Sequence, residues 1–352
     1  MIVGCRVFPT RRFSILVVSV VLCLVLFYHI RRRGGHVYSS VFFFLPTSWI
    51  SSAFPDAAHC YQPPEMDKVM VILKTGITES SHKIPVHIKT SLRCVPHYAI
   101  FSDFEEEFEI LDRSSSRRVP TVDVLRNVNE SVKQTNPDFD LYNRVHEMGR
   151  AALQMDEMSR HGDNMETPFG KKDNPGWKLD KWKFLPMIDE ALRMQPDAKW
   201  FVFMEADSYI IWPNLIRWLS RLDASKPFYL GSQMQIGDVV FAYGGAGIVL
   251  SNPAMRKVSE YHAQHGEELD IYTNGHWAGD CILGKVLSDA GVRFSWAWPM
   301  MQTARVWETN PFSTAYNRIP WCYPIVSFHH MTSDDIQYTW QFEQQWFEKV
   351  RQ

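Results

Sequence analysis

Residues 200–207 read Trp-Phe-Val-Phe-Met-Glu-Ala-Asp. The apolar start of this stretch is typical of a strand buried on both faces of a parallel sheet. The strand pattern stops abruptly at Glu205. Because open α/β sheets bind ligands at the carboxyl ends of their strands, the acidic end of this stretch predicts a binding site.

The segments around this stretch predict an alternation of strands and helices. Residues 69–73 and 97–101 are apolar runs that predict two more strands. Residues 181–194 have helical spacing despite Pro186. Residues 112–138 are polar, and we expect them to form a surface excursion. Strands that alternate with helices predict an α/β fold.

The composition is that of a folded globular protein. The chain has 352 residues, of which 45% are hydrophobic and 22% charged. The net charge of -2 gives no basic field for nucleic acid. Aromatic residues make up 14% of the chain. Such a content is compatible with a heavy core, a ligand-stacking surface, or both.

The amino-terminal part predicts a membrane anchor. Residues 13–30 contain no Lys, Arg, Asp or Glu and are just long enough to span a bilayer. Three arginines follow, without the small-residue pattern of a signal-peptide cleavage site. We therefore expect a cytoplasmic tail over residues 1–12, a signal anchor over 13–30, a stem over 31–66 and a lumenal domain over 67–352.

Two further features are compatible with a lumenal location. Asn129 begins an Asn-Glu-Ser sequon for glycosylation. Cys60, Cys94, Cys281 and Cys322 follow the predicted anchor, and an even number of cysteines suits an oxidising compartment. Their spacing does not match that of a zinc site.

The acidic end of the predicted strand is a candidate metal site. Glu205 and Asp207 are two residues apart, so in an extended chain their carboxylates point to the same side. Such oxygen donors suit Mg²⁺ or Mn²⁺ bound to phosphate. The alternative is that one acid caps a helix and the other is a solvated loop residue.

Two motifs further along predict close contact with a ligand. The glycines of residues 244–247 (Gly-Gly-Ala-Gly) let the backbone approach a ligand, and Ser251 is a candidate cap for a following helix. Asp280 lies at the start of a predicted helix over 279–290. It is either a general base or a helix cap. The glycine motif alternatively forms a tight junction without a ligand.

A histidine pair lies near the carboxyl terminus. His329 and His330 follow the apolar end of a predicted strand. Adjacent strand residues point to opposite faces, so we expect at most one of the two to serve a metal.

In chain order, these motifs resemble the Fringe-like family of β1,3-glycosyltransferases, and most closely its core 1 β1,3-galactosyltransferases. Residues 201–215 resemble the family segment that contains Asp-Asp-Asp-Thr-Tyr. Residues 244–251, 279–284 and 327–329 resemble its Gly-Gly-Ala-Gly, Glu-Asp-x-x-x-Gly and Ser-Phe-His motifs. Two positions depart from the pattern. Ala206 replaces the middle Asp, and Gly279 replaces the Glu, a polar residue that could help to place the acceptor.

The resemblance implies a GT-A-type, Rossmann-like fold with a central, mostly parallel sheet. It implies an inverting, metal-dependent transferase in the Golgi or ER membrane. The enzyme would move galactose or N-acetylglucosamine from a UDP-sugar to a hydroxyl of a glycan or glycoprotein, forming a β1,3 linkage. The expected cofactor is Mn²⁺ or Mg²⁺. The alternative is a catalytically inactive relative that binds glycans or partner proteins in the lumen.

The resemblance also implies roles for individual residues. Asp207 and His329 would bind the metal, and Asp280 would be the catalytic base. Further candidates are Thr75, Gly76, Lys181, Glu205 and Ala206 for the donor; Gly244, Gly245, Ala246 and Gly247 for the floor of the site; and Trp277, Trp296, Trp298 and Tyr323 for sugar stacking, although core packing is the commoner role of each. The expected disulfides are Cys60–Cys94 and Cys281–Cys322.

Overall fold

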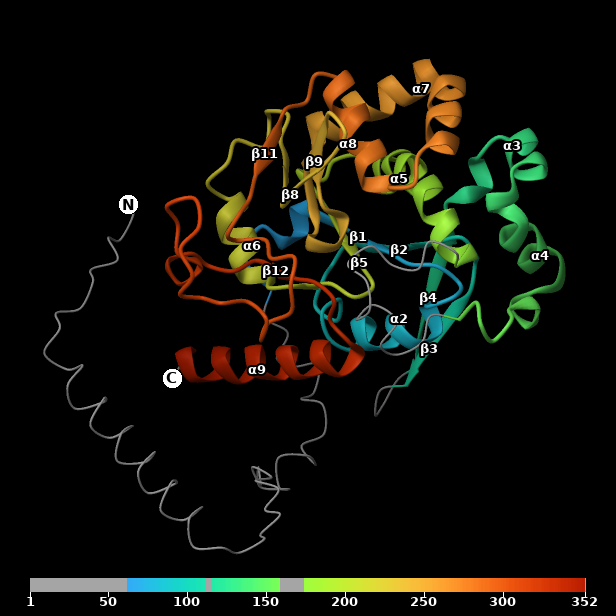
Figure 1. Ribbon diagram of the computed structural model, residues 1–352. Coiled ribbons are helices and arrows are strands. Elements are labelled where there is room, and N and C mark those ends of the chain that lie inside the picture. The colour runs from blue at the N-terminus through green and yellow to red at the C-terminus, as the bar shows by residue number, and fades with distance from the viewer. Residues whose placement is uncertain (1–61, 112–115, 159–173, 352) are drawn as a thin grey trace, which may run out of the picture. The chain divides into compact units, whose positions relative to one another are not determined.

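Two apolar layers lie on the two faces of a central sheet (Figure 1). The computed structural model of this chain describes residues 62–111, 116–158 and 174–351. Strand β5 (Trp200–Glu205) shows why both layers form. Phe201 and Phe203 pack into one layer, while Val202 and Met204 pack into the other. A strand covered on both faces is therefore apolar at successive positions, as predicted.

Within the described part of the chain, the main sheet has eight strands in the order β11-β7-β10-β5-β1-β2-β4-β3. Neighbouring strands are parallel except where β10 pairs with β5 and β7, and where β3 pairs with β4. The remaining bounds are β1 (Val69–Lys74), β2 (Tyr98–Ser102), β3 (Glu107–Leu111), β4 (Ser116–Asp123), β7 (Tyr229–Gly231), β10 (Ile248–Ser251) and β11 (Phe294–Trp296). This mostly parallel α/β architecture fits a GT-A-like fold.

Strand β4 corrects one prediction. Residues 112–138 were expected to form a surface excursion, but residues 116–123 form a strand that pairs in parallel with β2. Its polar sequence reflects its position near the edge of the sheet, where the side chains of Arg117 and Arg118 are exposed while Val119 is buried. The rest of the segment includes helix α3 (Glu130–Thr135), which begins after the exposed Asn129.

Helices cover each face of the sheet. Helices α5 (Pro175–Met194), α7 (Asn252–Gly275) and α8 (Gly279–Asp289) pack on the face that contains Phe201, together with α4 (Asp140–Met148). Helices α2 (Ser80–Lys89) and α6 (Trp212–Leu219) pack on the opposite face. The predicted helices over 181–194 and 279–290 are confirmed, and Pro186 lies inside α5.

Two small sheets complete the strands of the described residues. Strand β6 (Tyr209–Ile210) pairs with β12 (Ser327–Phe328), and β8 (Gln233–Ile236) pairs with β9 (Val239–Ala242). The last helix, α9 (Ser333–Arg351), packs against the first of these sheets and contacts α2. The β6–β12 pair therefore brings the carboxyl-terminal part of the chain to the end of β5.

Residues 60–352 form one compact unit. In the described part of this unit, no helix is both long and apolar enough for a membrane span. The predicted tail and anchor, and the stem up to residue 61, lie outside the described residues.

The cysteines correct a second prediction. Cys281 is a buried free thiol in α8, whereas Cys322 is exposed at the end of a short 3-10 helix (Pro320–Cys322), so the expected Cys281–Cys322 disulfide does not form. Cys94 is disulfide-bonded. The expected partner, Cys60, lies outside the described residues, and that pairing stays a prediction.

Candidate active site

The carboxyl ends of β1 and β5 bring together a lysine and two carboxylates. Lys74 pairs in register with Glu205 because the two parallel strands are neighbours. The ammonium of Lys74 lies 3.1 Å from Oε1 of Glu205 and also contacts the carboxylate of Asp180, which α5 supplies. Burial opposes a charge on Lys74, but Asp180 and Glu205 raise the pKa of Lys74. The lysine is therefore a fixed positive charge at the end of the central strands.

Asp207 lies next to this group and faces His329. Its Oδ1 is 3.2 Å from Nε2 of His329, and its Oδ2 is 3.8 Å from the ammonium of Lys83 on α2. Although burial acts in the opposite direction, Lys83 and His329 hold the pKa of Asp207 well below its usual value. Asp207 is therefore an anionic oxygen donor.

Asp207, His329 and His330 form a group that can hold a metal. Each offers a ligand atom, and these atoms lie within 4.8 Å of one another. Nδ1 of His329 and Nδ1 of His330 are both buried without a hydrogen-bond partner. Burial and the neighbouring His329 lower the pKa of His330 to about 4, which keeps this imidazole neutral, as metal binding requires. The residues present therefore fit a divalent metal.

The second histidine corrects the expectation that at most one could serve a metal. Strand β12 ends at Phe328, before the pair, and His330 has a φ of 57°. This left-handed turn cancels the alternation of side chains along a strand. The rings of His329 and His330 consequently lie 3.8 Å apart.

The predicted base, Asp280, is held by two backbone groups. The N–H of Gly244 donates to its Oδ2 at 2.9 Å, and the N–H of Cys281 donates to its Oδ1 at 2.9 Å. Ala278 occupies the cap position of α8, and Asp280 lies in the first turn, where it accepts the N–H of Cys281. Burial raises the pKa of Asp280 to about 6, against the effect of the Gly244 bond. A carboxylate with this pKa suits general base catalysis near neutral pH.

The glycine motif separates these groups and requires small residues. A Cβ on Gly244 would lie 2.7 Å from Oε1 of Glu205 and 3.6 Å from Oδ2 of Asp280. A Cβ on Gly245 would lie 2.2 Å from the ring of His329. The motif forms a turn with Ala246 buried in it, and Gly247 has a φ of 92°. It therefore forms a floor between the acidic residues and the histidine pair.

A buried ion pair supports the turn at Thr75 and Gly76. The ammonium of Lys183 lies 2.9 Å from Asp103 and donates to the carbonyl of Thr75 at 2.7 Å. A Cβ on Gly76 would lie 2.8 Å from Oδ2 of Asp103. The turn follows directly after Lys74, so it is adjacent to the site, and its role in donor binding stays a prediction.

The structure does not bring every predicted donor residue into the cluster. The ammonium of Lys181 pairs with Asp138 at 2.8 Å and donates to the carbonyl of Asn274 at 3.2 Å. Ala206 is buried, and Nε2 of His87 lies 2.9 Å from its carbonyl oxygen. Lys181 and Ala206 therefore contact other parts of the protein, and their role in donor binding stays a prediction.

The acceptor candidates make three aromatic contacts. The ring of Trp277 stacks on that of Trp177 at 5.9 Å. Trp296 and Trp298 stack at 5.7 Å. The guanidinium carbon of Arg318 lies over the ring of Tyr323, 5.9 Å from the ring centre. Their role in acceptor binding stays a prediction.

Sequence reasoning missed four charged or metal-binding residues of the site: Lys74, Lys83, Asp180 and His330. Lys74 had a readable signal, because a lysine directly after a buried strand is as informative as the acids after β5. Lys83 and Asp180 lie on helices, and helical spacing alone does not indicate which face is turned to a site.

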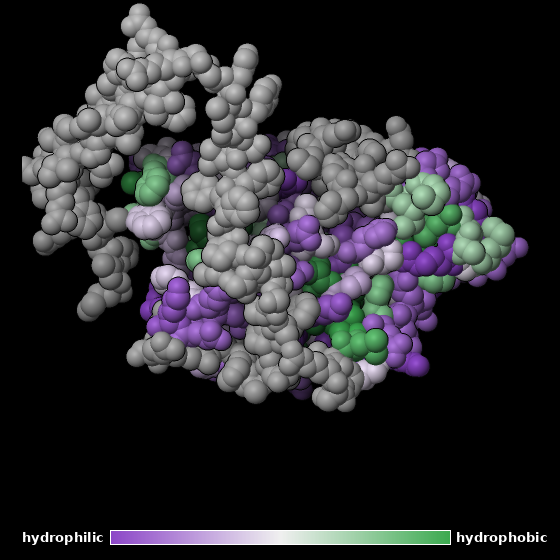
Figure 2. Space-filling model, turned by 90° about the horizontal axis from the view of Figure 1, so that it is seen from below, coloured by the Kyte–Doolittle hydropathy of each residue, from purple (hydrophilic) through white to green (hydrophobic). Residues whose placement is uncertain are grey.

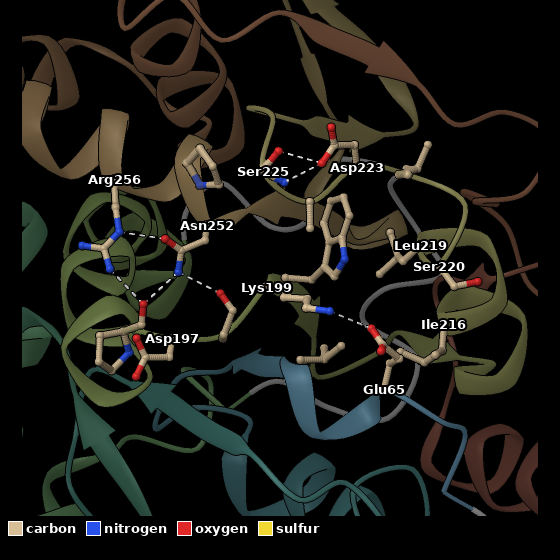
Figure 3. A pocket seen from close by; sticks show the side chains of 17 residues that line it. Glu65, Asp197, Lys199, Ile216, Leu219, Ser220, Asp223, Ser225, Asn252 and Arg256 are labelled. Carbon is tan, nitrogen blue, oxygen red and sulfur yellow. Dashed lines mark hydrogen bonds and ion pairs between the residues drawn. The ribbon is translucent and has the colours of Figure 1, made fainter.

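A separate pocket of about 790 Å³ lies at the opposite ends of these strands (Figure 3). Val69 and Trp200, the first residues of β1 and β5, line it. The two basic side chains labelled in Figure 3 both have partners in the pocket. The ammonium of Lys199 lies 3.0 Å from the carboxylate of Glu65, and Arg256 donates a hydrogen bond to Asn252 at 2.7 Å. The pocket contains none of the predicted site residues.

Residues 181–297 match the model of the Fringe-like family. The matched segment runs from α5 to β11 and includes the acidic end of β5, the glycine motif and Asp280. His329 and His330 lie after it, and the turn at Thr75 lies before it. The family resemblance of the motifs is thus confirmed over the part of the chain that carries most of the site. Over these residues, the chain is similar to the Fringe-like family.

Proposed function

We propose that this protein is an inverting, metal-dependent glycosyltransferase that uses a UDP-sugar. The match of residues 181–297 to the Fringe-like family supports a glycosyltransferase. The observation that carries the finer proposal is the juxtaposition of a carboxylate–histidine group, Asp207 with His329 and His330, and a separately held base, Asp280. The two parts meet across the Gly244–Gly245 turn.

The proposed chemistry divides between these two parts. Asp207, His329 and His330 would hold a divalent cation, with Mn²⁺ or Mg²⁺ as the proposed ion. When bound, the cation neutralises charge on the leaving diphosphate. Asp280 takes the proton of the acceptor hydroxyl, whose oxygen attacks the anomeric carbon as the bond to the diphosphate breaks. Direct attack inverts the configuration at that carbon.

The charge around Asp280 supports its role as a base. The N–H groups of Gly244 and Cys281 orient its two oxygens, so the carboxylate does not depend on a mobile side chain for its position. Lys74 forms ion pairs with both Glu205 and Asp180. The donor sugar, with galactose or N-acetylglucosamine proposed, and the β1,3 linkage rest on the motif resemblance to core 1 β1,3-galactosyltransferases.

The two departures from the family pattern do not favour the inactive alternative. Ala206 is buried with its carbonyl at His87, and a Cβ on Gly279 would lie 2.3 Å from the ring of Phe184. Packing therefore requires a small residue at Gly279, and Ala206 is buried beside the acidic group. Asp207 and Asp280 are present at the two ends of the proposed chemistry.

A screen of UDP-sugars tests the proposal. The full chain would be incubated with each UDP-sugar and Mn²⁺, with and without a chelator, and the release of UDP would be measured. We expect metal-dependent release from one or two donors and loss of release in Asp207→Asn. No release from any donor, together with no metal-dependent UDP binding by calorimetry, would favour the inactive, glycan-binding alternative.

A further inference from the structure

Helix α9 has two faces of different character. Its inner face contributes Ile336 and Trp340 to a small core, and the carboxylate of Glu343 accepts a hydrogen bond from Tyr209 at 2.6 Å. Tyr209 lies on β6, two residues after Asp207. The helix is therefore attached firmly to the catalytic unit, next to the strand that follows the metal-binding acid.

The outer face of α9 carries three large exposed aromatic side chains. Tyr338, Phe342 and Trp346 are 69%, 66% and 57% exposed. They are four residues apart, so they lie on one side of the helix, and the rings of Phe342 and Trp346 are 6.4 Å apart. Such a stripe on a soluble surface indicates an interaction site.

Charges extend this stripe symmetrically at both ends. Asp335 lies seven residues before Phe342, and Lys349 lies seven residues after it. At 3.6 residues per turn, these two and the three aromatic residues fall within an arc of about 80°. Tyr338 and Trp346 are likewise equidistant from Phe342. The face is acidic at its start, aromatic in its middle and basic at its end.

This pattern is complementary to itself in the antiparallel direction. Two copies of α9 related by a two-fold axis at Phe342 would bring Asp335 of each close to Lys349 of the other, and Tyr338 close to Trp346. A parallel pair would instead bring like charges together. We propose that α9 is the contact surface between two copies of this chain, paired antiparallel about Phe342.

The position of α9 is compatible with this proposal. The helix lies along one side of the described unit (Figure 1). The residues that are drawn in colour in the view from that side include both hydrophobic and hydrophilic ones (Figure 2). A 19-residue helix is about 28 Å long. Stable interfaces bury at least roughly 1,200 Å² in total, so we expect a contact made by one helix pair to give a weak dimer.

Cysteine cross-linking in the full chain tests the two-fold axis. Phe342→Cys places a thiol on the axis, whereas Glu348→Cys places an exposed thiol on the same helix, about 120° from it. We expect mild oxidation of membranes containing the full chain to give a covalent dimer with Phe342→Cys, beyond that of the parent chain, and none with Glu348→Cys. Equal dimer from both variants, or none from Phe342→Cys, would overturn the proposal. If the stripe rests on a bilayer instead, Phe342→Cys should give no covalent dimer.

Charge reversal tests the direction of pairing. Lys349→Glu should raise the dimer dissociation constant of the full chain about tenfold, measured by sedimentation in density-matched detergent. Adding Asp335→Lys to the same chain restores opposite charges across the axis and should recover most of the affinity. Asp335 also accepts the N–H of Thr332 at 2.9 Å, so the double variant is compared with Lys349→Glu rather than with Asp335→Lys alone. A double variant weaker than Lys349→Glu would contradict antiparallel pairing.

Discussion

At the scale of single residues, Asp280 determines how the proposed reaction responds to pH. Burial raises the pKa of its carboxyl from 3.8 to about 6. A base must be deprotonated to act, so its active form is present above this pKa and is lost as the pH falls through it. We expect kcat/KM for sugar transfer to fall about tenfold for each pH unit below pH 6. A pH–rate profile of the full chain measures this, and a flat profile over about pH 5 to 7 would argue against Asp280 as the base.

Gly245 is the residue on which the position of His329 depends. A methyl group there would lie 2.2 Å from the imidazole, so Gly245→Ala should displace the ring. We expect the Mn²⁺ concentration for half-maximal transfer to rise about 10- to 100-fold. Gly266→Ala is the matched control, because a Cβ at that helical position meets open space. An unchanged metal requirement in Gly245→Ala would show that His329 does not depend on this close approach.

The histidine pair shows why some site residues escape prediction. The alternation of strand residues allowed at most one of the two histidines to serve a metal, and the motif Ser-Phe-His indicated His329. The expectation that only one histidine could serve a metal assumed a strand that continues through both residues. In the structure the strand ends at Phe328, and the positive φ of His330 turns its ring back toward Asp207. A non-glycine residue with positive φ is uncommon, and the sequence does not reveal it.

At the scale of elements, the close approach of α5 and α8 depends on Gly279. A Cβ at this position would lie 2.3 Å from the ring of Phe184 and 2.8 Å from the backbone of Lys181. Gly279→Ala should therefore lower the free energy of unfolding by about 1–3 kcal/mol. Gly275→Ala, where a Cβ meets open space, should change it by less than about 1 kcal/mol. Chemical denaturation of both variants measures the difference. Equal stability would mean that the two helices can separate at little cost.

Buried elements were predictable, whereas elements near the sheet edge were not. The runs that became β1, β2 and β5 are apolar because both faces of each strand are covered, and this pattern is readable in the sequence. Strand β4 has exposed arginines, so its residues resemble a polar loop. Only its pairing with β2, a contact between segments distant in sequence, makes it a strand.

At the scale of the whole molecule, the order of the motifs predicted more than any motif alone. The acidic end of β5, the glycine motif, Asp280 and His329 come from separate elements, and the sheet brings them to one site. Their order indicated the Fringe-like family, whose model matches residues 181–297. The prediction of a Cys281–Cys322 disulfide was wrong. Cys281 is buried in α8 by tertiary packing, which the number of cysteines in the sequence does not reveal.

The central claim is that Asp280 acts as the base in sugar transfer while other residues bind the nucleotide. The most direct test compares the full chain with Asp280→Asn, which keeps the size of the side chain, in sugar transfer and in UDP binding by calorimetry with Mn²⁺. The account predicts that transfer falls about 10²- to 10⁴-fold, while the dissociation constant of UDP changes by less than about threefold. Undiminished transfer by Asp280→Asn would contradict it.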